Sequence, residues 1–214
     1  MRLLSYFFLR SVYQSSSLYN KNIEVRKIHK RYELLVNGIQ QTGVYTEKLW
    51  KKGVQLWSAS HSFIPKDILV FGVGGGTLFH IFHKLYPQSH VTGVDIDEEI
   101  IRIGKKYFGL ESLNNVSLIC QDARLFANNK KNIGYFDLVV LDIYIGNNVP
   151  EFVTTRKFLV AINELLRKNG SLVINYFSFH DQREKSNSLK VILSDIFHHV
   201  YMVRVLNNVL FVLK

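Results

Sequence analysis

Closely spaced glycines after an apolar run carry the clearest chemical signal in this sequence. The stretch FGVGGGTLF places Gly72, Gly74 and Gly76 directly after the apolar run DILVF and before a segment of helical periodicity. Glycines let a chain turn tightly and let its backbone approach a ligand closely, and the helix that follows begins with free N–H groups. The spacing is G-x-G-x-G, with Thr77 where a dinucleotide motif carries its third glycine. It predicts a site for a nucleotide-like ligand, and the alternative is a tight strand-to-helix turn without one.

Acidic side chains end the next two apolar runs, where they can reach the same ligand. Asp95 closes the run HVTGV, and an acidic residue so placed after a glycine turn accepts hydrogen bonds from ribose hydroxyls. Asp122 follows the run VSLIC, and its carboxylate can accept a hydrogen bond from an adenine amino group. A capping role is the alternative for Asp95 and a turn role for Asp122. Asp97 is instead expected to cap the helix that begins at Glu98.

From residue 67 onward, apolar runs of strand type alternate with segments of helical periodicity. Strands are predicted at 67–71, 90–94, 116–120, 136–141 and 171–177, and helices after the glycine turn, at 98–107 and at 155–167. Gly170 is expected to cap the last of these helices. After a further helix, two apolar runs are joined through Asn207 and Asn208 without a helix between them, which predicts an antiparallel hairpin. The expected fold class is α/β, a mostly parallel Rossmann-like methyltransferase sheet with a C-terminal antiparallel hairpin.

The first 62 residues have a different organisation. We expect a small N-terminal β segment and a linking helix over 1–62, followed by a Rossmann-like nucleoside-binding domain over 63–214. Asn37-Gly38 is a strong hairpin-turn dipeptide, and a helix is expected over 46–57. The alternation typical of half-buried strands is seen at Ile23, Val25, Leu34 and Val36.

Composition and charge narrow the classes of protein. Of the 214 residues, 47% are hydrophobic and 21% charged, as in a globular domain. The net charge of +10 has no long basic run behind it, so we expect a solvated surface and no specific nucleic-acid partner. The opening MRLLSYFFLR is too short to span a membrane, and we expect a loose or docked terminus, with a short signal peptide as the alternative.

Cysteine and histidine usage points to neither a disulfide nor a metal site. Cys120 is the single cysteine, which fits a reducing compartment, so we expect a cytoplasmic protein. Its thiol is expected to be inert and buried in an apolar strand. His80 and His83 have a spacing that can bind metal, but no Cys, Asp or Glu completes a set with them, and no metal site is predicted.

Taken together, these stretches resemble the spermidine synthase family. The resemblance extends over nearly the whole chain from about Tyr13 and rests on ILVFGVGGGTL, VTGVDIDEEIIRIGKKYF, VSLICQDARLF, FDLVVLDIY and FLVAINELLRKNGSLVIN. The earlier stretches YQSSSLYNKNIEV, LLVNGIQQ and YTEKLW are similar to the family's N-terminal β segment. The resemblance implies that S-adenosylmethionine or its decarboxylated form is the cofactor and that Gln41 contacts the nucleoside. It also places Asp142 at the edge of a pocket for a small-molecule acceptor, and implies a homodimer, because relatives commonly dimerise through the N-terminal region.

Departures from the family's pattern bear on which group is transferred. The family's glycine turn carries an Asp that binds the aminopropyl amine, and this sequence has Gly75 there. Aminopropyl synthases also carry D-x-x-D after the fourth strand, where the second carboxylate deprotonates and binds the amine, and this sequence has Asp142 followed by Ile145. The acidic pair that normally precedes the segment at Tyr45 is absent as well. Because an amine nucleophile needs its proton removed, these losses argue against aminopropyl transfer.

Methyl transfer makes lighter demands, because the sulfonium donor is already activated and the protein mainly aligns the acceptor. Asp142 and Tyr144 are the expected catalytic residues, with strand-end hydrogen bonding and simple packing as their alternatives. Tyr45 and Glu47 are further candidates for orienting an acceptor. We therefore expect an S-adenosylmethionine-dependent transferase of the spermidine synthase-like type, with methyl transfer favoured. Polyamine aminopropyl transfer and a non-catalytic binding or scaffold homologue are the alternatives.

Overall fold

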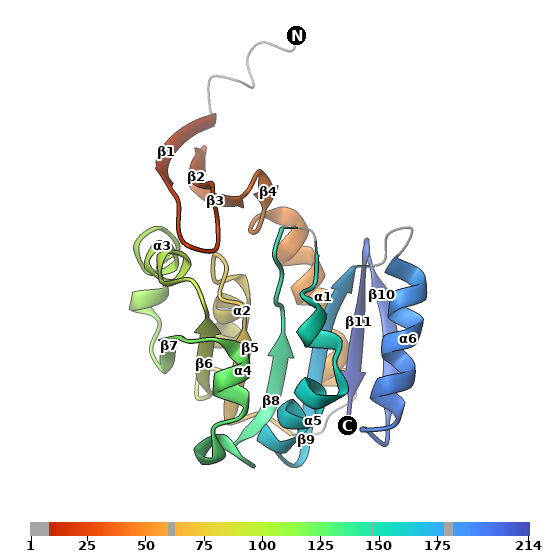
Figure 1. Ribbon diagram of the computed structural model, residues 1–214. Helices are drawn as coiled ribbons and strands as arrows, with labels where there is room; N and C mark the ends of the chain where they lie inside the picture. The colour runs from red at the N-terminus through yellow and green to blue at the C-terminus, as the bar shows by residue number, and fades with distance from the viewer. Residues whose placement is uncertain (1–8, 60–62, 147, 178–181) are drawn as a thin grey trace.

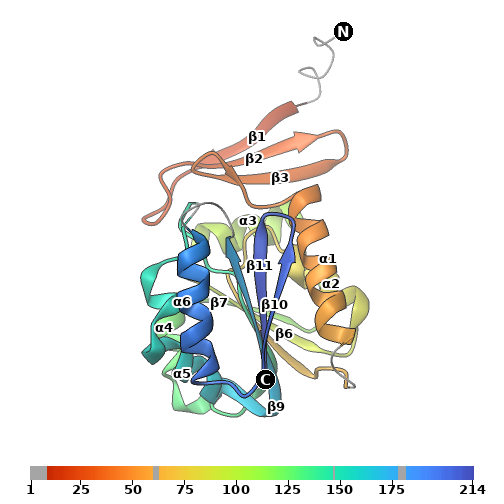
Figure 2. The ribbon, with the colours of Figure 1, turned by 90° about the vertical axis from the view of Figure 1, so that its right-hand side faces the viewer.

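The strands of the described residues form two sheets, of which the smaller comes from the N-terminal part of the chain. The computed structural model describes residues 9–59, 63–146, 148–177 and 182–214. The N-terminal sheet is antiparallel, with its strands in the order β1 (Leu9–Ser15), β2 (Ile23–Ile28), β3 (Arg31–Val36) and β4 (Ile39–Gln40). Figures 1 and 2 show this sheet lying across the end of the larger sheet toward which the parallel strands point.

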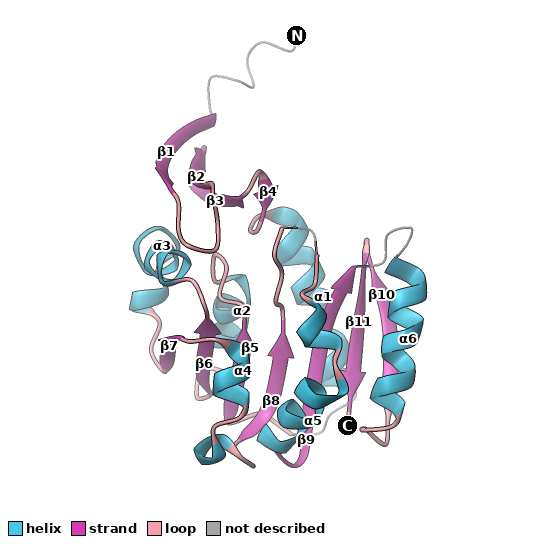
Figure 3. Cartoon of the chain, viewed as in Figure 1, coloured by secondary structure: helices cyan, strands magenta, loops and turns pink. Residues whose placement is uncertain are grey.

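The larger sheet has seven strands in the order β10-β11-β9-β8-β5-β6-β7. The strands β7, β6, β5, β8 and β9 are parallel, whereas β11 runs antiparallel to β9 and β10 antiparallel to β11 (Figure 3). The predicted α/β class with a C-terminal hairpin is therefore confirmed. The bounds are β5 (Asp67–Phe71), β6 (His90–Asp95), β7 (Val116–Cys120), β8 (Phe136–Leu141), β9 (Leu166–Phe177), β10 (Val200–Val205) and β11 (Asn208–Leu213).

Helices pack on both faces of the larger sheet. Strand β5 shows why: Ile68 and Val70 pack in one buried cluster with side chains of α1, α2 and α3, whereas Leu69 and Phe71 pack in another with α4, α5 and α6. Burial of each such side chain contributes about 1.5–3 kcal/mol. The helices are α1 (Val44–Ala59), α2 (Thr77–Leu85), α3 (Glu98–Phe108), α4 (Ala123–Ala127), α5 (Arg156–Leu165) and α6 (Gln182–Ser194). Within the described ranges, no helix combines the length and apolar character needed to cross a bilayer.

The N-terminal sheet is held over helix α3 by a small apolar cluster of its own. The alternating residues predicted to face inward are buried, and they pack against Ile100 and Ile103. Tyr13 Oη also donates a hydrogen bond of 2.8 Å to Glu99 Oε1 near the start of α3. These contacts bring the loop between β1 and β2, and the β3–β4 hairpin, to the carboxyl ends of β5, β6 and β8. The Asn37-Gly38 turn is confirmed, because both residues have positive φ and Val36 pairs with Ile39.

Two local predictions are wrong. Gly170 does not cap a helix, because α5 ends at Leu165 and β9 begins at once, with Leu166 paired to Phe136 of β8. The pairing with β8 prevails over the capping preference of glycine. Cys120 is exposed rather than buried, because it is the last residue of β7, the edge strand of the sheet.

Candidate functional site

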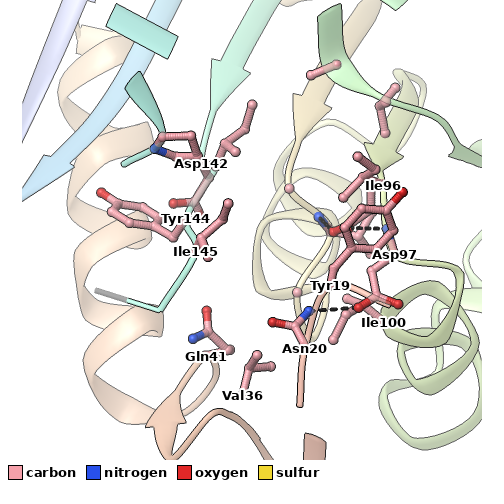
Figure 4. A pocket seen from close by; sticks show the side chains of 18 of the residues that line it. Tyr19, Asn20, Val36, Gln41, Ile96, Asp97, Ile100, Asp142, Tyr144 and Ile145 are labelled. Carbon is pink, nitrogen blue, oxygen red and sulfur yellow. Dashed lines mark hydrogen bonds between the residues drawn. The ribbon is translucent and has the colours of Figure 1, made fainter. Parts of the chain in front are cut away.

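A cavity of ≈ 410 Å³ lies where the carboxyl ends of β5, β6 and β8 meet the N-terminal sheet. Parallel strands end at a common edge, which is where α/β proteins of this kind bind their ligands. Figure 4 shows Asp142, Tyr144 and Ile145 along one wall, with Tyr19 and the residues after β6 on the opposite wall. The cavity therefore collects side chains from distant parts of the sequence, and its volume lies in the range of small-molecule sites.

The glycine turn forms the floor between β5 and α2. Gly72 has φ of 93°, and a Cβ at this position would lie 2.9 Å from the carbonyl carbon of Asp142. Only glycine therefore allows the chain after β5 to pass so close to the chain after β8. Gly74 lines the cavity, whereas Gly76 is the N-cap of α2, with φ of 78°. The structure thus brings the predicted turn to the cavity, beside a helix N-terminus.

Asp95 ends β6 and is hydrogen-bonded directly to the glycine turn. Its Oδ2 accepts a hydrogen bond of 2.9 Å from Val73 N, and its Oδ1 accepts one of 3.0 Å from Asp97 N. Burial raises the pKa of Asp95 above its ordinary value, and the backbone N–H donors oppose that rise. A carboxylate has about four lone-pair positions, so the side chain can still accept from a ligand besides these backbone donors.

Asp122 lines the same cavity but is already engaged by its own helix. Its Oδ1 accepts a hydrogen bond of 2.7 Å from Arg124 N at the start of α4, and the Arg124 guanidinium binds both carboxylate oxygens. This guanidinium holds the pKa of Asp122 below its ordinary value. Arg124 also lies over the ring of Phe152, 5.0 Å from its centroid. The predicted contact with an adenine amino group would have to be made alongside Arg124.

Asp142 follows β8 and is held between two neutral donors. Its Oδ2 accepts a hydrogen bond of 3.1 Å from Trp50 Nε1 of α1, and its Oδ1 accepts one of 2.8 Å from Asn175 Nδ2 of β9. Burial raises the pKa of Asp142 to about 6, although both hydrogen bonds lower it. A carboxyl group with such a pKa is ionised at neutral pH and can still take up a proton, which suits a general base.

A chain of hydrogen bonds behind Asp142 was not predicted from the sequence. Asn175 Oδ1 accepts from Asn208 Nδ2 at 2.8 Å, and Asn208 Oδ1 accepts from Tyr45 Oη at 2.6 Å. Tyr144 Oη donates to the backbone oxygen of Asn175 at 2.8 Å. The chain links α1, the C-terminal hairpin and β9 to the one carboxylate, and it fixes which way each amide side chain points.

The N-terminal residues close the cavity from the side opposite Asp142. Asn20 Nδ2 and Ser17 Oγ donate hydrogen bonds of 2.7 and 2.5 Å to Asp97 Oδ2. Asp97 Oδ1 accepts from Glu99 N at 3.0 Å, which confirms its predicted role as the cap of α3. Gln41 lines the cavity after β4, and its Nε2 donates to the Ile39 backbone oxygen at 3.3 Å. Its contact with a nucleoside stays a prediction.

Position 75 has no room for a side chain. A Cβ added to Gly75 would lie closer than 3.0 Å to the methyl carbon of Thr42, a separation that real Cβ atoms essentially never show. Thr42 is buried, and its Oγ1 accepts a hydrogen bond of 2.9 Å from Leu34 N. The other departure, Ile145, lines the mouth of the cavity with 63% of its surface exposed. At position 75 the packing of Thr42 therefore leaves no space for the carboxylate side chain that the family pattern carries.

The residues around the cavity fit a nucleoside with a charged tail. The floor is a glycine turn, Asp95 can accept further hydrogen bonds, and α2 begins with N–H groups that suit an anionic group. Such a set can hold a ribose and the amino-acid end of S-adenosylmethionine. The described residues contain no group of three His, Cys, Asp or Glu side chains placed to hold a metal ion.

Comparison with known proteins finds similarity to methyltransferases and to aminopropyltransferases. Residues 66–208 match the family described as methyltransferase domain. The polyamine aminopropyltransferase of Vibrio vulnificus is 36% identical over 115 residues, which are 53% of this chain and 38% of that protein. A probable spermidine synthase of Corynebacterium glutamicum superposes with a TM-score of 0.80 at 20% identity, over 94% of this chain and 79% of that one. Human methyltransferase-like protein 13 in complex with SAH superposes with a TM-score of 0.65 at 19% identity, over 80% and 82% of the two chains.

These likenesses differ in what they show. The two superpositions are below one quarter identity and show the fold. The chain covers well under half the length of the curated aminopropyltransferase that it matches. The family match, in contrast, includes the glycine turn, the three strand-end aspartates and the C-terminal hairpin up to Asn208. The chain therefore belongs to the methyltransferase domain family, and its fold is like that of spermidine synthases.

Proposed function

We propose that this chain binds S-adenosylmethionine and transfers its methyl group to a small acceptor held beside Asp142. The observation that carries the proposal is the packing at Gly75, where the methyl carbon of Thr42 takes the place of a side chain. The decarboxylated donor ends in a cationic amine, which gains from a carboxylate at this position in the family pattern. S-adenosylmethionine carries its own carboxylate, which an acidic side chain would repel and the N–H groups at the start of α2 would favour.

Each group of the donor's nucleoside would have a residue that binds it. Asp95 would accept hydrogen bonds from the ribose hydroxyls, because its carboxylate keeps acceptor capacity besides the backbone N–H groups that it binds. Asp122 and Gln41 would contact the base and the nucleoside as the resemblance implies. The glycine turn would lie against the amino-acid end. The roles of these residues are the same for either donor, so they support binding without deciding which group is transferred.

Asp142 has the properties that the acceptor side of the reaction needs. When bound, S-adenosylmethionine supplies a methyl carbon on a sulfonium, so the acceptor's lone pair forms the new bond while the electrons of the carbon–sulfur bond go to sulfur, leaving S-adenosylhomocysteine. Asp142 would take the proton that the acceptor loses, because its pKa of about 6 leaves it ionised at neutral pH. Trp50 and Asn175 both donate to it, which keeps the carboxylate oriented and ionised.

Aminopropyl transfer is the second candidate, and a specific observation favours it. The similarity to the Vibrio vulnificus protein, which is named a polyamine aminopropyltransferase, supports this alternative better than it supports methyl transfer. The same wall of the cavity keeps Asp142, which could attract an amine under either chemistry. Gly75 and Ile145 argue against aminopropyl transfer, because each replaces a carboxylate of the family pattern, the first on the donor side and the second on the acceptor side. We give these two positions more weight because they lie in the cavity itself.

Calorimetric titration of the full chain with each donor tests the proposal. We expect S-adenosylmethionine to bind at least about 10-fold more tightly than the decarboxylated form, a difference of about 1.4 kcal/mol. Methylthioadenosine, which lacks the amino-acid end, measures the nucleoside contribution by itself. A preference for the decarboxylated donor would overturn the proposal in favour of aminopropyl transfer. No binding of any of the three ligands would favour the non-catalytic scaffold.

A further inference from the structure

The cavity wall that faces the acceptor carries a single negative charge. Among the described residues that line the cavity, four are carboxylates: Asp95, Asp97, Asp122 and Asp142. Asp95 holds the glycine turn, Asp97 holds Ser17 and Asn20, and Asp122 is paired with Arg124. Figure 4 shows Asp142 on the wall with Tyr144 and Ile145, across the cavity from Asp97. One carboxylate can balance one positive charge on an acceptor.

Beyond Asp142, this wall becomes apolar toward the mouth. Ile143 and Ile145 follow Asp142 along the chain, and Val36 of β3 comes in from the N-terminal sheet. The backbone of Ile145 is fixed by a pair of hydrogen bonds with Asn148, of 2.9 and 3.1 Å. A second ammonium group placed here would meet no carboxylate to balance its charge, and its contacts with these apolar side chains would cost it part of its hydration. An alkyl segment would instead gain from contact with these side chains.

The positive charge of the whole chain also disfavours a ligand with two positive charges. The net charge is +10, and helix α1, which supplies Thr46 and Trp50 to the cavity, also carries exposed Lys48 and Lys52. A field of this sign opposes the approach of a dication more than that of a singly charged ligand. The effect weakens as salt screens the charges, so it can be separated experimentally from the local effect of Ile145.

We propose that the acceptor is an amine with one positive charge and an apolar body, and not a diamine or polyamine. The inference rests on the proposed function in assigning the acceptor to the wall of Asp142. It deepens that function by naming the substrate class. The amine head binds Asp142 as an ammonium, because Asp142 keeps free lone pairs after accepting from Trp50 and Asn175. Asp142 then takes one proton from the ammonium, and the freed lone pair forms the bond to the methyl carbon while the electrons of the carbon–sulfur bond go to sulfur. The apolar body lies along Val36 and Ile145.

Two amines of equal length test the preference directly. Hexylamine and 1,6-diaminohexane differ only in the distal ammonium group, and each is titrated calorimetrically into the full chain saturated with S-adenosylhomocysteine. We expect hexylamine to bind about 5- to 10-fold more tightly, with part of the difference lost at high salt. Tighter binding of the diamine would overturn the proposal, and so would the absence of binding by either amine. Neither result bears on donor choice, which the donor titrations measure separately.

A charge placed at position 145 provides the matched control. Ile145→Asp puts a carboxylate at the mouth, and we expect it to shift the affinity ratio toward the diamine by about 3- to 10-fold, given a partly exposed ion pair. Ile145→Asn introduces a side chain of nearly the same shape as Asp but without its charge. We expect it to lower the affinity for hexylamine without creating a preference for the diamine. Circular dichroism checks that both variants fold. An equal shift in the two variants, or no shift in Ile145→Asp, would contradict the inference.

Discussion

The contact between Thr42 and Gly75 predicts that a single methyl group at position 75 destabilises the fold. A Cβ there would lie closer than 3.0 Å to Thr42 Cγ2, whereas its next neighbours, Phe108 Cε1 and Thr42 Cβ, are 3.4 Å away. Thr42 cannot move aside freely, because it is 4% exposed and its Oγ1 accepts a hydrogen bond from Leu34 N. We expect Gly75→Ala to lower the free energy of unfolding by about 1–3 kcal/mol, the usual cost of overpacking.

Thr42→Ser relieves this overlap with little other change, because serine keeps Oγ1 and lacks Cγ2. By itself it should cost about 1 kcal/mol for one lost buried methyl group. In the Thr42→Ser variant, Gly75→Ala should lower the free energy of unfolding only slightly. This difference corresponds to a coupling energy between the two substitutions of about 1–2 kcal/mol. Urea denaturation of the wild type, both single variants and the double variant measures this coupling, provided the m-values agree. An equal cost of Gly75→Ala in both backgrounds would refute the packing argument.

The space that Thr42→Ser opens beside position 75 allows a carboxylate to be placed there, which should change the preference between the two donors. Thr42→Ser/Gly75→Asp places a carboxylate at the donor end, with Thr42→Ser alone as its control. We expect the double variant to shift the ratio of affinities toward decarboxylated S-adenosylmethionine by about 10-fold or more, measured by calorimetry. If a folded double variant kept the donor preference of Thr42→Ser, the electrostatic reasoning about position 75 would be wrong.

Further predictions concern the remaining charged groups. Asp95→Ala should weaken adenosyl ligand binding by about 1.5–3 kcal/mol in calorimetry, while Asp195→Ala, which removes an exposed ion pair with Arg156, leaves it unchanged; equal effects would remove the ribose assignment. Because the pKa of Asp142 is raised to about 6, activity should fall as the pH drops through 6. The same raised pKa means that the free energy of unfolding falls as the pH rises from about 4 to about 6, and Asp142→Asn should flatten this dependence in denaturation experiments. Asn175→Leu removes a hydrogen bond that lowers this pKa, so the acidic limb of the activity profile should move to higher pH, and an unmoved limb would exclude Asn175 as a positioning residue. Binding of DNA or RNA, measured by fluorescence anisotropy, should be weak and should vanish at physiological salt. Tight, sequence-selective binding at that salt would show that the positive charge serves a nucleic-acid partner.

The strand-end residues could be predicted because they follow from chain direction alone. Apolar runs interrupted by helices imply parallel strands, and parallel strands bring their carboxyl ends to one edge. Asp95, Asp122 and Asp142 each follow such a run, so their gathering around the glycine turn needed no tertiary detail. The assignment of individual contacts to these residues stays a prediction.

The residues behind Asp142 could not be predicted, because they depend on strand order and register. Asn175 reaches Asn208 only because β11 lies beside β9 and pairs with it so that Leu210 stands opposite Asn175. Tyr45 joins them from α1, far away in the sequence. Isolated asparagines at a strand and a turn carry no pattern that distinguishes this role from ordinary turn formation. The only available signal was that Asn175 interrupts an otherwise apolar strand.

The packing at position 75 could not be predicted from the sequence either, although the sequence shows that a glycine stands there. The sequence shows that a carboxylate is absent there, but not that Thr42, from the loop after the N-terminal sheet, has taken its space. That contact depends on how the two sheets meet, which the apolar cluster with α3 determines. The prediction that Gly170 caps a helix was wrong for a similar reason, because the pairing of β9 with β8 prevailed over the local capping preference of glycine.

The nucleoside product of a complete reaction tests the central claim most directly. The full chain is incubated with equal amounts of S-adenosylmethionine and its decarboxylated form, together with hexylamine and putrescine, and the products are identified by mass spectrometry. Methyl transfer predicts S-adenosylhomocysteine and a methylated hexylamine. Methylthioadenosine together with spermidine would contradict the account and establish aminopropyl transfer instead.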